Sequence, residues 1–134
     1  TRADRSGRRR RPGLGRVRIL YGSVMSIEVP IESLLAQVGD WGWCYFATVS
    51  DDGRAHLVAL RPDLVAGTLR FEVGTGRARR NAMARPDVAL VFPPRTDVTE
   101  PRGYSLVVDG RAEDVADAVV AVRPTSAVLH RPAP

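Results

Sequence analysis

The sequence contains no lysine, only one cysteine and no long apolar run. The lone Cys44 excludes an internal disulfide and fits a reducing compartment such as the cytoplasm. No apolar stretch reaches the ~18 residues that a membrane-spanning helix needs, and no secretory signal is recognisable. With two histidines in the whole chain, neither a metal cluster nor a Ser/His/Asp set is expected.

Positive charge is concentrated at the start of the chain, although the net charge is +5 and all twenty basic residues are arginine. Residues 1–24 hold eight arginines and one acid, whereas residues 25–134 hold twelve arginines and fourteen acids. We therefore expect a disordered basic arm or upstream extension at 1–24, with Met25 as the physiological start, and one domain at 25–134. Binding of nucleic acid through this arm is a disfavoured alternative, because no aromatic residue interleaves the arginine run.

Apolar periodicity predicts a helix over 30–38, in which Ile31, Leu34, Leu35 and Val38 share one face and Gly39 ends it. Three β-rich runs follow, at 43–50, 55–60 and 68–73, joined by a turn at Asp51-Asp52-Gly53 and another at Gly67. Because their connections are short, we expect these three strands to form an antiparallel meander.

The chain from 71 to 92 is the most informative segment. It reads as a strand end, a turn at Gly74-Thr75-Gly76, a short helix at 77–85, a stop at Pro86 and another strand at 88–92. Thr75 is the expected N-cap. Three arginines, Arg77, Arg79 and Arg80, fall in the first helical turn, where free N–H groups and the helix dipole favour an anion. This pattern predicts a site for a phosphate-bearing ligand.

The remaining segments also favour strands. Residues 104–108 form a β-type run, and Asp109-Gly110 indicates a bulge or bend in it. The β-branched residues of 115–123 favour a hairpin that turns near Ala116-Asp117 over a helix. About six strands with two short helices predict a mainly β fold, a small antiparallel barrel with helices at its ends.

Three segments together resemble the pyridoxamine 5′-phosphate oxidase-like family of FMN-binding split-barrel flavoproteins: ATVSDDGRAHLVALRP, GTLRFEVGTGRARRNAMARPDVALVFPP and YSLVVDGRAE. The resemblance covers roughly 34–121. It implies a six-stranded split β-barrel with two or more short helices, a homodimer, and a flavin-type cofactor in clefts between the subunits. In the short helix, Ala78 replaces a lysine that the family oxidases tend to carry.

The resemblance also assigns candidate cofactor-binding residues. Arg61, late in the second strand, and Arg77 match basic positions that hold the cofactor phosphate, and His56 matches a further basic position. The backbone of Leu57, Val58 and Ala59 is similar to the segment that lies along the isoalloxazine ring. The whole expected set is His56, Leu57, Val58, Ala59, Arg61, Gly74, Thr75, Arg77, Arg80 and Asn81. No catalytic residue is assigned, and Cys44 is expected in the core.

The function implied by the resemblance is an FMN-dependent oxidoreductase that transfers a hydride to or from a small molecule. A deazaflavin-dependent reductase and a non-catalytic cofactor- or haem-binding protein remain alternatives. Oxidation of pyridoxamine phosphate itself is not expected, because the substrate-binding signature of those oxidases is reduced to His130 and Arg131, and their N-terminal substrate segment has no counterpart after Met25.

Overall fold

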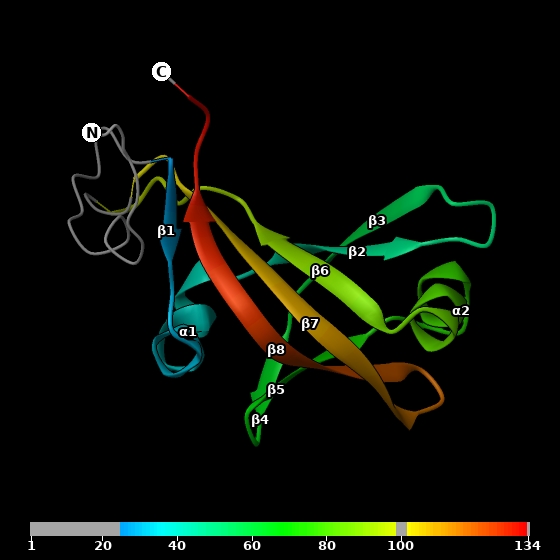
Figure 1. Cartoon of the computed structure of the whole chain (residues 1–134). Helices are drawn as coiled ribbons and strands as arrows, with labels where there is room; N and C mark the ends of the chain where they lie inside the picture. The colour runs from blue at the N-terminus through cyan, green and yellow to red at the C-terminus, as the bar shows by residue number, and fades with distance from the viewer. Residues whose placement is uncertain (1–24, 99–101, 134) are drawn as a thin grey trace, which may run out of the picture.

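The computed structural model describes residues 25–98 and 102–133, in which one curled antiparallel sheet carries short helices at its ends (Figure 1). The basic arm at 1–24 therefore lies outside the described residues. The elements in order are β1 (Ser26–Glu28), α1 (Ile31–Gln37), the 3-10 helix η2 (Val38–Trp41), β2 (Cys44–Val49), β3 (Ala55–Leu60), β4 (Asp63–Val65), β5 (Thr68–Glu72), α2 (Arg77–Ala84), β6 (Asp87–Phe92), β7 (Ser105–Ala116) and β8 (Val119–His130).

The mainly β, antiparallel half-barrel confirms the expected fold class. The described residues form eight strands rather than about six, because β1 and β4 are too short to leave a periodic signal. Helix α1 follows the predicted apolar face, and with Val38 as its C-cap it places Gly39 directly after the cap, as predicted; the chain then continues as the 3-10 helix η2. None of the described helices is long and apolar enough to cross a bilayer.

The expected meander of three strands is wrong. Strand β2 pairs with β3, but β5 pairs with β4 and β8, which gives the order β3-β2-β6-β7-β8-β5-β4. The reason is the length of β8. This strand pairs with β7 on one side, and on its other side its C-terminal part accepts β1 and its N-terminal part accepts β5. Strand β3 is consequently left at an edge of the sheet.

The inner face of the sheet holds the core. In β2, Cys44, Phe46 and Thr48 point inward, and the rings of Phe46 and Phe71 lie 5.2 Å apart between centroids. Cys44 is fully buried, as expected, and desolvation raises the pKa of its thiol to about 12. A thiol held in its neutral form is a poor nucleophile, so Cys44 serves packing.

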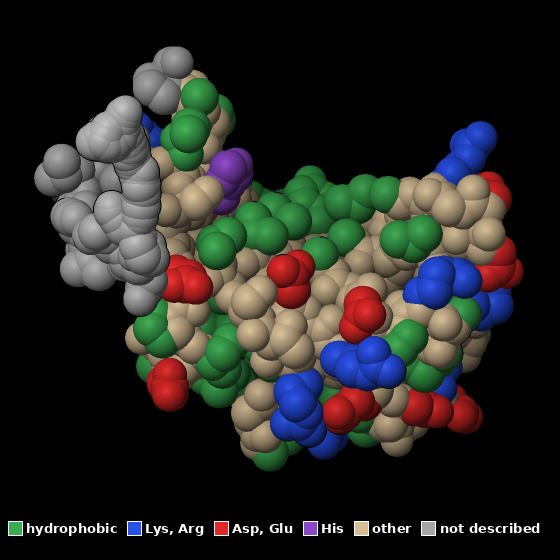
Figure 2. Space-filling model, viewed as in Figure 1, with side chains coloured by type: hydrophobic (Ala, Val, Ile, Leu, Met, Phe, Trp, Pro, Cys, Tyr) green, Lys and Arg blue, Asp and Glu red, His purple; other side chains and the backbone are tan. Residues whose placement is uncertain are grey.

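The outer face of the sheet is also apolar along β3, β2 and β6. Cross-strand pairs place Tyr45 beside Ala59 and Val91, and Ala47 beside Leu57 and Ala89. Tyr45 and Val49 are each 40% exposed and Leu57 is 53% exposed. We call this surface the outer apolar face; hydrophobic side chains form a band above the centre of the molecule in Figure 2, where these strands lie in Figure 1.

Two backbone predictions in the last hairpin are confirmed. Strand β7 ends at Ala116 and β8 begins at Val119, so the chain turns where expected. The register shifts between Asp109 and Gly110, which is the predicted bulge. Gly110 is required there because a Cβ at this position would lie 2.5 Å from Val122 Cγ1 and 2.9 Å from the Arg123 carbonyl oxygen.

Replacing Gly110 by alanine is therefore expected to destabilise the fold by about 1–3 kcal/mol through overpacking. The urea concentration at half-unfolding measures the change. Gly39→Ala is the matched control, since a Cβ at Gly39 meets nothing within 4 Å and its backbone φ is not positive. Equal midpoints for the two variants would contradict the packing argument.

Candidate cofactor cleft

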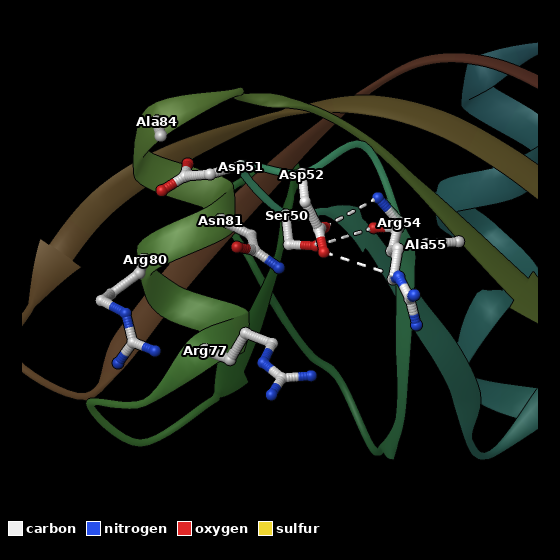
Figure 3. Close-up of a pocket in the computed structure, with 9 residues that line it drawn as sticks. All are labelled: Ser50, Asp51, Asp52, Arg54, Ala55, Arg77, Arg80, Asn81 and Ala84. Atoms are coloured by element: carbon white, nitrogen blue, oxygen red, sulfur yellow. Dashed lines mark hydrogen bonds and ion pairs between the residues drawn. The ribbon is translucent and has the colours of Figure 1, made fainter.

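An open cleft of about 730 Å³ lies between α2 and the turn that joins β2 to β3 (Figure 3). Its lining is mostly polar or charged: Ser50, Asp51, Asp52, Arg54, Ala55, Arg77, Arg80, Asn81 and Ala84. The cleft thus brings together three of the residues expected from the sequence, Arg77, Arg80 and Asn81. Ser50, Asp52 and Arg54 were not anticipated, because the spacing of a surface turn does not reveal which helix it faces.

Helix α2 presents different residues to the sheet and to the cleft. Ala78 and Ala82 are buried against the core, and Asn81 is 4% exposed. The Asn81 side-chain amide donates a hydrogen bond to Thr48 Oγ1 at 3.1 Å inside the protein. Arg77 and Arg80, one turn apart, lie on the same face of the helix and line the cleft. Asn81 therefore fixes the helix, while the two arginines remain at the surface.

The N-terminus of α2 differs from the sequence prediction. Gly76 rather than Thr75 occupies the N-cap position, and no side chain caps the helix. The first intrahelical bond runs from the Arg80 N–H to the Gly76 carbonyl, so the N–H groups of the first three helical residues precede it. Gly74, with φ +73°, and Thr75 are both exposed in the preceding turn. This leaves the end of the helix open to an acceptor.

Arg79 does not substitute for the lysine that Ala78 replaces. Its guanidinium donates to the Ala116 carbonyl at 2.9 Å and pairs with Asp114 at 2.7 Å, on the β7–β8 hairpin. The side chain is only 17% exposed. Because adjacent helical residues point about 100° apart, Arg79 is directed away from the face that carries Arg80. It anchors α2 to the hairpin.

Arg85 joins the C-terminal end of α2 to the β2–β3 turn. Its Nε donates to the Val49 carbonyl at 2.8 Å, and Nη2 pairs with Asp51 at 2.7 Å. The sequence around Arg85 gives no indication of its contacts with Val49 and Asp51, which lie more than thirty residues earlier in the chain. Asp51 is thus neutralised by a residue outside the cleft.

The other carboxylate of the cleft, Asp52, is held within its own turn. It accepts hydrogen bonds from Ser50 Oγ at 2.7 Å and from the Arg54 N–H at 3.2 Å. These bonds, chiefly that of Ser50, lower the pKa of Asp52, with a smaller contribution from the charge of Arg77. Asp52 is therefore a fixed negative charge at neutral pH.

The side chains of Arg77 and Arg80 form no hydrogen bond or ion pair with any residue in the described part of the chain. Both side chains extend outward from α2 (Figure 3). Two unpaired guanidinium groups beside free helical N–H groups form a site with the chemistry that a phosphate requires.

The residues expected on β3 divide between two faces. Leu57, Ala59 and Arg61 lie on the exposed side, whereas His56 and Val58 are half-buried on the inner side. Arg61 lies at the far end of β3 from the cleft, where a Cβ at Gly42 would be 3.4 Å from its Nη1. Four strand residues lie between His56 and Arg61, which places these two residues roughly 17 Å apart. Arg61 does not line the cleft that holds Arg77, so this cleft does not bring together the two arginines that were expected to hold one phosphate.

His56 lies opposite Thr48 in the β2–β3 pair, and Thr48 is the residue that accepts the Asn81 hydrogen bond. Its Nδ1 is buried and makes no hydrogen bond within the described residues. These residues also contain no group of three or more side chains that could hold a metal ion.

Comparison with known proteins identifies relatives and the fold. The chain is 37% identical over 121 residues to uncharacterised proteins of Mycobacterium bovis and Mycobacterium tuberculosis, which covers 79% of this chain and 82% of each relative. No protein-family model matches. Among solved structures, an FAD-binding protein of Mesorhizobium loti matches with a TM-score of 0.61 at 15% identity, over 79% of this chain and 99% of its own.

A candidate pyridoxamine 5′-phosphate oxidase of Lactobacillus delbrueckii matches with a TM-score of 0.54 at 19% identity, over 78% of this chain and 98% of its own. The protein belongs to one family with the two mycobacterial relatives, and its fold is that of pyridoxamine 5′-phosphate oxidase-like split barrels.

Other split-barrel proteins differ in what they bind. An F420 reductase matches with a TM-score of 0.51 at 23% identity, over 64% of this chain and 88% of its own. A haem storage protein of Vibrio cholerae matches with a TM-score of 0.54 at 13% identity, over 71% and 92%. At these identities the likeness concerns the fold alone. The ligand of this split barrel is therefore inferred from the residues that line its own cleft.

The Asn81–Thr48 hydrogen bond is expected to contribute to stability. Asn81→Ala leaves the buried Thr48 hydroxyl without its donor, which costs about 1–3 kcal/mol and lowers the urea midpoint. Arg80→Ala, an exposed change on the same helix, is expected to stay within about 0.5 kcal/mol of the unmodified protein. If Asn81→Ala unfolded at the unmodified midpoint, Asn81 would not be the residue that fixes α2.

Proposed function

We propose that this split-barrel protein binds a phosphate-bearing flavin-type cofactor, FMN in the first instance, and acts as an oxidoreductase on a small molecule. The observation that carries the proposal is the pair of unpaired guanidinium groups, Arg77 and Arg80, in the cleft beside the uncapped start of α2. Both side chains are exposed, so a bound anion can reach the two guanidinium groups and the N–H groups at the start of the helix together.

The residues present fit the phosphate end of such a cofactor. Asp51 is bound to Arg85, and Asp52 is held by Ser50 and the Arg54 backbone. Neither carboxylate pairs with Arg77 or Arg80. A volume of about 730 Å³ is within the range of small-molecule sites, roughly 300–1,000 Å³.

The ring end of the cofactor is assigned to β3. This strand is at an edge of the sheet, so the backbone N–H and C=O groups on its outer side pair with no other strand of the described residues. Leu57 and Ala59 present apolar surface there, and Arg61 provides a cation at the end of the strand. Because FMN carries its phosphate on a chain away from the ring, Arg61 and Arg77 serve opposite ends of one ligand.

A bound flavin supplies the hydride chemistry, and the contribution of the chain is binding and orientation. Arg77 and Arg80 neutralise the phosphate, and the edge of β3 orients the ring. His56, with its unsatisfied Nδ1 beneath the same strand, is a further candidate contact.

A deazaflavin cofactor is the second candidate, since it also presents an anionic phosphate, and a split-barrel F420 reductase supports it. Haem is the third. The apolar haem macrocycle suits the polar lining of the cleft less well than a phosphate does. Haem iron commonly takes a histidine ligand, and His130, one of the two histidines, is exposed and already forms a hydrogen bond with Ser26 at 3.0 Å.

The phosphate assignment predicts a selective loss of affinity. Arg77→Ala and Arg80→Ala should each weaken FMN binding roughly tenfold to a hundredfold, because each removes charge-assisted hydrogen bonds. Riboflavin has the same ring without the phosphate, so its affinity should be unchanged. Titration of flavin fluorescence measures both affinities.

Two variants complete this experiment. Arg61→Ala should weaken FMN and riboflavin alike, because it acts at the ring end. Arg123→Ala, which removes an arginine paired with Glu113 outside the cleft, should leave both affinities unchanged. Equal losses of FMN and riboflavin in Arg77→Ala would place the phosphate elsewhere.

We also assign the outer apolar face to a homodimer interface. Its exposed side chains come from three paired strands, and contiguous apolar patches of this kind mark association surfaces. A second copy of the same face, which is self-complementary in a twofold dimer, is the simplest partner.

Tyr45→Arg places a charge within this face and should raise the dimer dissociation constant at least tenfold. Sedimentation equilibrium is expected to give twice 14.6 kDa for the unmodified protein and a shift toward 14.6 kDa for the variant. Val65→Arg is a control of similar exposure, 38% against 40%, on the distant strand β4. A monomeric unmodified protein at micromolar concentration would refute the interface.

A further inference from the structure

We infer that Arg79 is a positioning residue for the cofactor phosphate: it fastens the first turn of α2 to the β7–β8 hairpin and so holds Arg77 and Arg80 in the cleft. The inference rests on the proposed function, since it concerns how the two phosphate-binding arginines are held. It begins from the contacts of Arg79, which is bound to the hairpin although Arg77 and Arg80, in the same turn of the helix, line the cleft.

One guanidinium group holds both strands of the hairpin. Arg79 Nη1 donates a hydrogen bond to the Ala116 carbonyl at 2.9 Å and reaches the Val119 carbonyl at 3.5 Å. Nη2 donates to the Asp114 carboxylate at 2.7 Å, and the Arg79 side chain is only 17% exposed. Because Ala116 ends β7 and Val119 begins β8, the planar fork of Arg79 bridges the turn between the two strands.

The same hairpin also holds the chain just before α2, which lies beside it (Figure 1). The Val73 N–H donates to the Ala118 carbonyl, in the turn of the hairpin, at 2.8 Å. Val73 and Arg79 therefore bracket the turn at Gly74-Thr75-Gly76 and the start of the helix, and both are attached to one support. Arg77 and the free N–H groups of the helix lie between these two attachment points.

The start of α2 has few other attachments. No side chain caps the helix, and the turn before it contains two glycines, which have more backbone freedom than other residues. The contacts of Asn81 and Arg85 hold the second half of the helix. In the first helical turn Ala78 is buried, but its methyl side chain forms no polar contact. Arg79 is thus the side chain that fixes the direction of the first turn.

The strand assigned to the flavin ring is separate from this hairpin. In the order of the sheet, β2 and β6 lie between β3 and β7. Loss of the Arg79 contacts should therefore shift Arg77 and Arg80 without moving β3. The phosphate end of the cofactor should then bind more weakly, while the ring end binds as before.

The test compares FMN with riboflavin in variants of Arg79. Arg79→Ala should weaken FMN binding roughly fivefold to twentyfold, because Arg77 and Arg80 lose their fixed position, and should leave riboflavin binding unchanged. Arg79→Lys keeps the positive charge but lacks the planar fork, so it should recover roughly half of the loss or less on a logarithmic scale. Titration of flavin fluorescence measures the affinities, and urea unfolding shows that each variant folds.

Replacing the partner of Arg79 separates its position from its charge. Asp114→Ala removes an acid, so electrostatics alone would tighten FMN binding. The positioning role predicts the opposite, a loss of roughly twofold to fivefold, because Arg79 loses its shortest contact.

Asp117→Ala is the matched control for the change in charge. Asp117 lies in the turn of the same hairpin, is exposed, and its side chain forms no hydrogen bond or ion pair within the described residues. Its replacement should leave FMN affinity within about twofold of the unmodified protein, since an exposed charge without a partner is largely screened by salt.

The outcomes separate this inference from the proposed function. Unchanged or tighter FMN binding in Asp114→Ala, full recovery in Arg79→Lys, or equal losses of FMN and riboflavin in Arg79→Ala would overturn the positioning role and leave the proposed function standing. If Arg79→Ala does not fold, Arg79→Lys and Asp114→Ala decide the question by the same comparison. Failure of FMN to bind the unmodified protein would overturn the proposed function, and the positioning role with it.

Discussion

The docking of helix α2 on the sheet is the contact on which the candidate site depends. The helix has only eight residues, too few to be stable by itself, so tertiary contacts hold it in place. The buried Asn81–Thr48 hydrogen bond fixes its middle, Arg79 ties it to the β7–β8 hairpin, and Arg85 ties its end to the β2–β3 turn. With these partners assigned, Arg77 and Arg80 are the arginines of α2 that remain for a ligand.

Arg79 and Arg85 bind other parts of the protein, whereas Arg77 and Arg80 line the cleft and give it its positive charge. The body of the chain contains slightly more acids than arginines, so a general positive surface does not explain anion binding. What the structure provides instead is local: one carboxylate is paired from outside the cleft, the other is held in its turn, and two guanidinium groups stay unpaired. The proposed phosphate site follows from this local balance of charge.

Local patterns in the sequence predicted local structure well. The helix that carries Arg77, the turn at Gly53 with φ +84° and the bulge at Gly110 were all predicted, because each depends on residues close together in the chain. Resemblance to a family supplied the overall fold, which the solved split barrels bear out.

Contacts between distant segments were not predictable in the same way. The pairing of β5 with β8 replaced the expected meander, because a free strand edge from the end of the chain competes with the neighbouring hairpin. The ion pair of Arg85 with Asp51 gave no signal in the sequence, because these residues are far apart in the chain. Arg61 was expected beside Arg77, but it does not line the cleft that holds Arg77. Arginines that look alike in the sequence thus have different roles, because the fold places different partners beside them.

A crystal structure of the protein with FMN is the most direct test of the central claim. The account predicts that the phosphate lies within hydrogen-bonding distance of both the Arg77 and Arg80 guanidinium groups, at the N-terminal turn of α2, with the ring along β3. A phosphate bound away from these two arginines, or a ring that does not contact β3, would contradict it.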